Sequence, residues 1–149
     1  MVTYAHVYNL CGFPVYLQNL VLPNGTFEWE HVHALNKEVS KCIAKQERRF
    51  VPVELEFLRL HLGFSKKEFA SFFGVRKSDV SLWEQGVQTT EIHHEAALRR
   101  FILRSSFIEP PDIAESLTWN TRVLDPEKLY YVFEASDAPR FVLIKSPSW

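Results

Sequence analysis

The most informative part of the chain is residues 65–86, which read Ser-Lys-Lys-Glu-Phe-Ala-Ser-Phe-Phe-Gly-Val-Arg-Lys-Ser-Asp-Val-Ser-Leu-Trp-Glu-Gln-Gly. Ser65 is a helix-capping residue type, and Glu68 three positions later completes a capping box, so a helix is predicted to begin here. Gly74 is predicted to end it, because glycine adopts the left-handed conformation with little strain. A second short helix follows and is predicted to end at Gly86. The stretch therefore predicts two short helices joined by a glycine turn.

Apolar residues in this stretch recur at the spacing of buried helix faces. The predicted inward residues are Phe69, Ala70, Phe72 and Phe73 in the first helix, Val75 in the turn, and Val80 and Trp83 in the second helix. A small side chain at Ala70 lets the two helices touch, and the β-branched side chain of Val80 packs the second helix down. This arrangement is expected to hold the second helix against the first.

Together these residues closely resemble the helix-turn-helix of the Cro/cI-type (Xre-like) repressors. The usual text of that motif is close to Gly-Val-x-x-x-x-Val-Ser-x-Trp-Glu-x-Gly. Its fixed letters are present here as Gly74, Val75, Val80, Ser81, Trp83, Glu84 and Gly86. The resemblance implies a DNA-binding module whose second helix enters the major groove with its N-terminal residues at the base edges. The alternative interpretation of the spacing alone is a helical hairpin inside an ordinary core.

The resemblance also implies which residues contact DNA. They are Ser65, Lys66 and Lys67 at the start of the first helix, and Arg76, Lys77, Ser78, Asp79, Ser81, Leu82 and Gln85 along the second. Free N–H groups and positive charge at Ser65 and Lys66 favour a phosphate. An Arg or Lys can bond guanine O6 and N7, and Gln85 can pair with adenine. Asp79 is expected either to accept from cytosine N4 or to pair with a local basic residue.

Two positions depart from the family text. Arg76 occupies the capping position that Ser or Thr usually holds, so the second helix is expected to be poorly capped unless Ser78 or a DNA phosphate supplies the bond. Leu82 stands where a polar residue is common, which favours apolar contact with a thymine methyl group or with protein. The identity of the bases therefore stays open.

Composition and charge agree with a globular regulator. The chain has 149 residues, of which 46% are hydrophobic, and its net charge is −1. Residues 59–104 hold eight Lys or Arg against five Asp or Glu, which leaves this segment at +3 and the remainder at −4. A locally basic module within an acidic frame suits a specific regulator better than a nonspecific coating protein.

Several protein classes are disfavoured by what the sequence lacks. It has no run of 18 apolar residues and no basic-then-apolar leader, so we expect a soluble, cytoplasmic protein without a membrane partner. Cys11 and Cys42 are far apart and form no CxxC pair, which predicts reduced, half-buried thiols. No phosphate loop, nucleophile elbow or Ser/His/Asp signature is present, so we expect neither an enzyme nor a cofactor.

A metal site is a weak alternative. His31 and His33 lie two residues apart and would face one side of a strand, with Cys42 next in sequence. The spacing matches no known set of metal ligands, so ordinary polar residues are the preferred interpretation and no metal is expected.

The segment before the motif is predicted to form a β-hairpin and a helix. Residues 15–22 are rich in β-formers, residues 23–25 are a Pro-Asn-Gly turn, and residues 26–30 alternate apolar with polar side chains. Residues 4–8 are a candidate for an earlier strand. Residues 34–46 carry Leu35, Val39, Cys42 and Ile43 at helical spacing, so they predict an amphipathic helix.

Further helices and strands complete the expected fold. Residues 47–52 are predicted to be a connector, with Pro52 in the first turn of a helix over residues 53–62. Another helix is predicted over residues 91–104, with Ala96, Ala97, Phe101 and Ile102 on its inner face. After the Pro-Pro break at residues 110–111, residues 129–133 and 140–144 are predicted strands around a turn at 136–139. This second hairpin is expected to pair with the first one or with a partner subunit.

The predicted fold class is α+β, with a helical Cro/cI-like domain of four to five helices between short N- and C-terminal β elements. The expected parts are a hairpin and helix at 1–50 that dimerises, a helix-turn-helix DNA-binding domain at 51–106, and a β extension at 107–149. The front of the chain resembles, more weakly, regulators related to the MqsA-type antitoxins. The residues that carry this likeness are Tyr8, Cys11, Gly12, Glu54, Phe57, Leu58 and Arg59, whereas the zinc-binding CxxC pairs of those antitoxins are missing.

The sequence thus predicts a DNA-binding transcriptional regulator. A single such module makes few base contacts, so we expect a homodimer on a palindromic operator of double-stranded DNA, repressing its own operon. The alternative is an antitoxin-like module that masks a cognate toxin, with DNA binding secondary.

Overall fold

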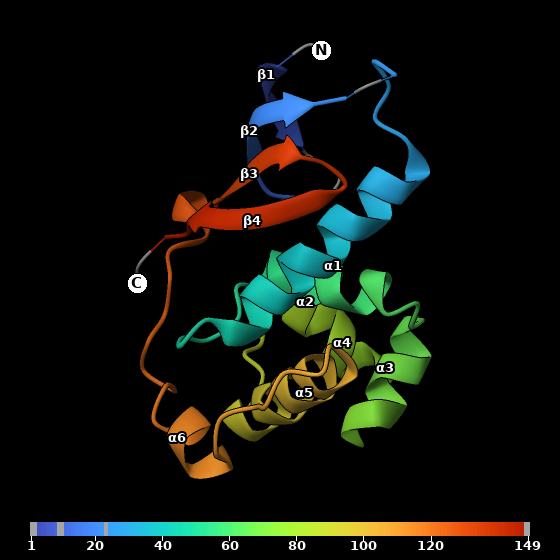
Figure 1. The fold of residues 1–149 in the computed structure, drawn as a ribbon. Coiled ribbons are helices and arrows are strands. Elements are labelled where there is room, and N and C mark those ends of the chain that lie inside the picture. The colour runs from blue at the N-terminus through green and yellow to red at the C-terminus, as the bar shows by residue number, and fades with distance from the viewer. Residues whose placement is uncertain (1–2, 9–10, 23, 148–149) are drawn as a thin grey trace.

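The computed structural model describes residues 3–8, 11–22 and 24–147, which form a mixed α+β fold. The strands are β1 (Thr3–Tyr8), β2 (Val15–Val21), β3 (Tyr131–Asp137) and β4 (Arg140–Lys145). The helices are α1 (Trp29–Lys45), α2 (Pro52–His61), α3 (Lys66–Phe73), α4 (Lys77–Glu84), α5 (Ile92–Ser105) and α6 (Ile113–Leu117), with a 3-10 turn at Pro126–Lys128. The sheet lies at one end of the molecule and α2–α6 at the other, and α1 links the two (Figure 1).

The sheet is assembled from both ends of the chain, in the order β1-β2-β3-β4. β1 and β2 form one antiparallel pair, and β3 and β4 form another. The two pairs are joined by parallel pairing of β2 with β3, in which Leu17 lies opposite Phe133. Both of these side chains are fully buried. Of the two pairings expected for the C-terminal strands, the one with the N-terminal hairpin is therefore confirmed.

The predicted strand over residues 26–30 is wrong. The chain instead enters α1 at Trp29, where the Glu28 N–H donates to Nδ1 of His31 at 2.9 Å. The ring of Phe27 stacks on His31 and also packs against Phe141 of β4. Buried residues at His31 and Leu35 continue the period-four pattern toward the N-terminus, so the helix starts one turn earlier than predicted. The hairpin partner of β2 is β1.

The four helices predicted between residues 52 and 104 are confirmed, in order, as α2 to α5. Pro52 is the first residue of α2, where its missing N–H costs nothing. The short helix α6 was not predicted. It follows the Pro-Pro break, and the Asp112 carboxylate caps it by accepting from the Ala114 N–H at 3.2 Å.

The connector between α1 and α2 holds a buried ion pair. The Arg48 guanidinium donates to both carboxylate oxygens of Glu54, at 2.7 and 3.1 Å. The Tyr131 hydroxyl of β3 donates to Glu54 at 2.6 Å and accepts from Arg48 at 3.1 Å. All three side chains are fully buried. The network therefore joins the connector, α2 and the sheet at one point.

Arg99 of α5 contacts both the end of α1 and the same connector. Its guanidinium donates to four backbone carbonyls, those of Ile43, Ala44, Gln46 and Arg48. It also lies over the Phe50 ring, 4.1 Å from the centroid, and 5.2 Å from that of Trp119. Burial lowers the pKa of Arg99 to about 10, so the side chain is still charged at neutral pH.

Cys11 and Cys42 are free thiols, and both are buried more fully than predicted. Burial raises the pKa of each thiol to about 12, so neither is a thiolate at neutral pH. No helix in the described ranges combines the length and the apolar character that crossing a membrane requires.

Glu54→Gln should destabilise the protein strongly, because it leaves the Arg48 charge buried without a carboxylate. We expect the free energy of unfolding to fall by about 3–5 kcal/mol. The double variant Arg48→Met/Glu54→Met removes both charges and should lose less. Urea denaturation followed by circular dichroism measures both losses.

Glu38→Gln is the matched control, because Glu38 pairs with Lys41 on the half-exposed side of α1. It should change the stability by less than about 1 kcal/mol. A double variant that is no more stable than Glu54→Gln would show that the pair is not the source of the loss.

Candidate nucleic-acid interface

The helix α3 begins and ends as the sequence predicts. The Ser65 hydroxyl accepts from the Glu68 N–H at 3.1 Å, and the Glu68 carboxylate accepts from the Ser65 N–H at 3.1 Å, which completes the capping box. These bonds from Ser65 hold the pKa of Glu68 below its usual range. Gly74 ends α3 in the left-handed conformation, with φ 70° and ψ 32°. The chain can therefore turn directly into α4.

The start of α4 is capped by a residue that the sequence did not suggest for this role. The Asp79 carboxylate accepts from the backbone N–H of Arg76 at 3.0 Å, and the Arg76 guanidinium lies 3.4 Å from the same oxygen. These bonds lower the pKa of Asp79, the backbone N–H of Arg76 being the main cause. Of the two roles expected for Asp79, the geometry is that of pairing with a local basic residue.

The inner side of α4 is buried. Val80 is fully buried and Trp83 is 3% exposed, as predicted. The ring of Trp83 meets Phe73 of α3 edge to face, with the centroids 5.5 Å apart. Ala70 of α3 is also buried, and α3 and α4 are in contact. The aromatic contact of Trp83 with Phe73 is therefore part of what fixes α4 to α3.

A buried ion pair that sequence reasoning missed fixes α4 to α2. The Glu84 carboxylate accepts from the Arg59 guanidinium at 2.7 and 3.0 Å, and both side chains are at most 10% exposed. Arg59 also donates to the Phe64 carbonyl at 3.1 Å. In the sequence, the signal for the burial of Glu84 is its position directly after Trp83, which faces inward.

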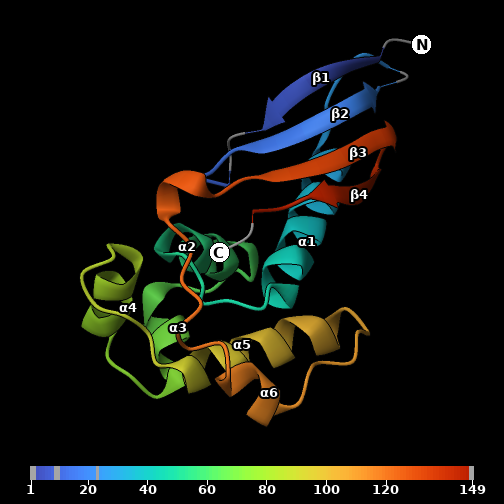
Figure 2. The same cartoon turned by 90° about the vertical axis from the view of Figure 1, so that its left-hand side faces the viewer.

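The polar residues of α4 lie mainly on its outer side. At about 100° per residue, Lys77, Ser78, Ser81, Leu82 and Gln85 fall within an arc of roughly 140°, opposite Val80 and Trp83. Figure 2 shows α4 at the outer edge of the helical part of the molecule. The side chain of Lys66, at the start of α3, reaches this arc and donates to the Ser81 hydroxyl at 3.3 Å. The first turn of α3 and the outer side of α4 are therefore one continuous surface.

None of the ten residues predicted to contact DNA is buried. Ser65, Lys67, Arg76, Lys77, Ser78 and Gln85 are exposed, and Lys66, Asp79, Ser81 and Leu82 are half-buried. Four of the ten are Lys or Arg, and the single acid among them, Asp79, is occupied by the Arg76 contacts. The surface is therefore net positive. Arg59 and Arg99 count toward the charge of the segment but are buried and do not contribute to this surface.

The predicted inner faces need two corrections. Phe72 of α3 is 38% exposed, and on α5 Phe101 is 41% exposed and Ala97 is also exposed. The inner face of α5 is formed by Ala96 and Ile102, as predicted, together with Leu98 and Leu103. A helix with apolar residues on two sides can bury only the side that its neighbours cover, and here α3 and α5 each leave one side open.

The histidines predicted as metal-ligand candidates do not share a face. His31 and His33 lie on α1 and not on a strand, so His31 is buried against Phe27 and His33 is exposed beside Trp29. Within the residues that the structure describes, no three His, Cys, Asp or Glu side chains gather closely enough to hold a metal ion.

Comparisons with protein-family models, with curated proteins and with solved structures found none that matches this chain.

Replacing Gly74 tests the turn between α3 and α4. Gly74→Ala forces a side chain into the left-handed conformation, which costs about 1–2 kcal/mol, although no described residue other than the two adjoining ones comes within 4 Å of the added methyl group. Gly74→Asn should lose less, because asparagine tolerates this conformation. Thermal denaturation of both variants measures the difference, and equal losses would contradict the backbone explanation.

Proposed function

We propose that this protein is a sequence-specific DNA-binding transcriptional regulator of the helix-turn-helix type, in which α4 is the reading helix. The observation that carries the proposal is the division of α4 into two sides. Val80 and Trp83 seat it on the module, whereas its outer side presents polar and basic groups at the edge of the molecule. A helix held in this way can lie in a major groove, which is wide enough to admit it.

The residue types on the surface fit the two kinds of contact that such a complex needs. Arg76 and Lys77 are at the N-terminal end of α4, from which reading helices reach base edges, and both suit guanine. Gln85 suits adenine, and Leu82 suits a thymine methyl group. Ser65, Lys66 and Lys67 open α3, where free backbone N–H groups and positive charge favour phosphate. Base contacts would then specify the site while α3 positions the module.

The proposed active form is a homodimer on a palindromic operator, acting as a repressor of its own operon. One short reading helix contacts few base pairs, so two copies related by a two-fold axis are needed for specificity. The sheet is the part proposed to dimerise. Its edge strand β4 exposes three consecutive apolar residues, Val142, Leu143 and Ile144, and an exposed apolar edge is a template for pairing with another chain.

Lys77→Ala tests the reading helix. The operator is first selected from a pool of random double-stranded DNA. Because Lys77 is exposed, the variant should keep its stability within about 0.5 kcal/mol. Operator binding should weaken by about 1–3 kcal/mol if Lys77 reads a base, as measured by fluorescence anisotropy. The wild type should also lose affinity with salt, at roughly 0.9 log units per contacted phosphate for each log unit of salt.

Two controls accompany this test. Lys45→Ala removes an exposed lysine of α1 and should leave operator binding unchanged. Trp83→Ala should lose about 3–5 kcal/mol of stability through the cavity it leaves, and should lose binding only by unfolding. Operator affinity equal to wild type for Lys77→Ala, at matched salt, would show that α4 is not the reading helix.

The double variant Val142→Lys/Ile144→Lys tests the dimer. Lysine on an edge strand opposes pairing with another chain, so we expect a monomer in light scattering and weaker operator binding. Leu60→Lys, at an exposed apolar position of α2, is the matched control and should stay dimeric. A wild-type chain that is monomeric at high concentration, both free and on DNA, would contradict the proposed dimer.

A further inference from the structure

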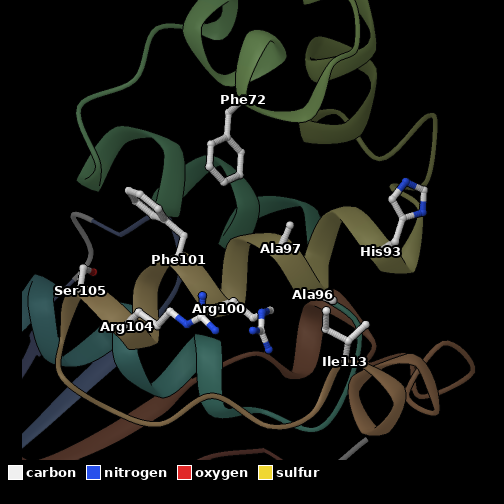
Figure 3. A pocket seen from close by; sticks show the side chains of 9 residues that line it. All are labelled: Phe72, His93, Ala96, Ala97, Arg100, Phe101, Arg104, Ser105 and Ile113. Carbon is white, nitrogen blue, oxygen red and sulfur yellow. The ribbon is translucent and has the colours of Figure 1, made fainter.

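An apolar groove opens between the end of α3, one side of α5 and the start of α6, with a volume of about 710 Å³. Its apolar walls come from Phe72, Ala97, Phe101 and Ile113. In Figure 3 the Phe72 ring reaches from α3 toward α5, and Ile113 lies at the opposite side, on α6. The groove is separate from the residues proposed to contact DNA.

The aromatic residues of the groove are held in place although they are exposed. The rings of Phe72 and Phe101 meet edge to face, with their centroids 5.5 Å apart, and Phe64 packs within 6.4 Å of both. Between 38% and 47% of Phe72, Phe101 and Ile113 is exposed. A cluster of large exposed apolar residues that is already ordered marks an interaction surface more often than scattered ones do.

A further large apolar side chain is exposed just beyond the end of α5. Phe107, two residues beyond the helix, is 99% exposed. Its backbone is in the left-handed region, with φ 58°, which is rare for a bulky residue. Nothing in the described part of the chain covers this ring, and the unusual backbone holds it outside. Phe107 therefore has the features of an anchor for another molecule.

The charges at the groove are of one sign. Arg100 and Arg104 of α5 lie along it, and their side chains extend side by side in Figure 3. Among the described residues, neither guanidinium has a carboxylate within ion-pairing distance, and Arg100 donates only to the Pro111 carbonyl, at 3.4 Å. Two neighbouring cations without an acid repel each other, and an acidic ligand would relieve this repulsion.

We propose that the groove binds an amphipathic helix of a partner protein, with an apolar stripe that packs on Phe72, Phe101 and Ile113 and acidic residues that pair with Arg100 and Arg104. A groove beside a helix, with aromatic walls, is the common receptor for an amphipathic helix. Arginine forms bidentate pairs with carboxylates, so the acids of the partner also fix its register. This partner surface shares no residue with the proposed DNA-binding surface.

Two other occupants fit less well. A second copy of the chain, docked about a two-fold axis through Phe101, would bring the guanidinium groups of both copies together. A DNA duplex would match the arginines but would place phosphates against the phenylalanine rings, which offer them no hydrogen bond. The combination of apolar walls and unpaired arginines is best matched by an acidic amphipathic helix.

The test is a selection on the full chain from a displayed library of helical peptides. Leu or Phe is fixed at positions i, i+3, i+4 and i+7, and the flanking positions are randomised among Glu, Lys and Ser. We expect Glu to be enriched over Lys at the flanks. A fluorescent version of the most enriched peptide should then bind saturably in anisotropy titrations.

Groove variants give the decisive comparison. Phe101→Ser should weaken binding of that peptide by about tenfold or more, as removal of a hot-spot aromatic does. Arg100→Glu/Arg104→Glu should weaken it as well and should favour a peptide whose Glu residues are replaced by Lys. Leu60→Ser, at an exposed site on α2, should bind the peptide like the wild type. If Phe101→Ser does not fold, Ala97→Gln, which adds bulk at an exposed wall of the groove, takes its place.

Several outcomes would overturn the proposal. One is that the library yields no enriched peptide, and another is that Lys is enriched over Glu at the flanks. A third is peptide binding that neither Phe101→Ser nor Ala97→Gln weakens. Loss of self-association in Phe101→Ser would instead identify the occupant as a second copy of the chain. None of these outcomes depends on DNA binding, because the operator affinity of Lys77→Ala tests a different surface.

Discussion

The fold depends most on the buried pair between Arg48 and Glu54, together with the Tyr131 hydroxyl. Burying two charges costs several kcal/mol per ion unless each is paired and its remaining hydrogen bonds are made. Here the carboxylate also accepts from the Val51 N–H, and Arg48 also donates to the Arg49 carbonyl, at 2.9 and 3.1 Å. The contacts among Arg48, Val51 and Glu54 need only the connector and α2, whereas those of the Tyr131 hydroxyl also need β3. The full set of hydrogen bonds is therefore made only when the sheet and the helices are assembled.

The same constraint reaches the candidate interface through α2. Glu54 fixes the first turn of this helix to the connector, and Arg59, near its end, is clamped to Glu84 of α4. α2 thus connects the buried network to α4 through two buried ion pairs. The connector is also held by Glu95 of α5, which accepts from the Phe50 N–H at 2.8 Å and from Arg49 at 2.8 Å. The position of α4 is consequently fixed in part by buried ion pairs in the interior of the molecule.

The parts of the fold that were predicted correctly from the sequence are those determined by residues close together in the chain. The capping box of Ser65 and Glu68 and the left-handed conformation of Gly74 involve only residues that are close in sequence, so both can be predicted from the sequence. The alternation over residues 26–30 is too short to distinguish a strand from the first turn of a helix. The parallel pairing of β2 with β3 joins residues more than a hundred positions apart, and no local pattern encodes it.

The burial of charged residues in the core could not be predicted, for a similar reason. Arg48, Glu54 and Arg99 look like surface residues in sequence, and only their partners, distant along the chain, make burial possible. That none of the proposed DNA-contacting residues of α4 is buried could be predicted, because the opposite side of α4 is marked by Val80 and Trp83. The cap at Arg76 could not be assigned in advance, because the side chain that provides it, Asp79, is also a residue type that reads bases.

The two proposed surfaces meet in α3, which has more aromatic residues than one buried face can hold. Phe69 is fully buried, Phe73 packs on Trp83 of α4, and Phe72 turns to the groove. The rings of Phe72 and Phe73 touch edge to face, with their centroids 4.9 Å apart. A partner helix packed on Phe72 would therefore rest on the same aromatic cluster that seats the proposed reading helix. Any displacement of that cluster would act on both surfaces, since closely packed aromatic rings cannot shift singly.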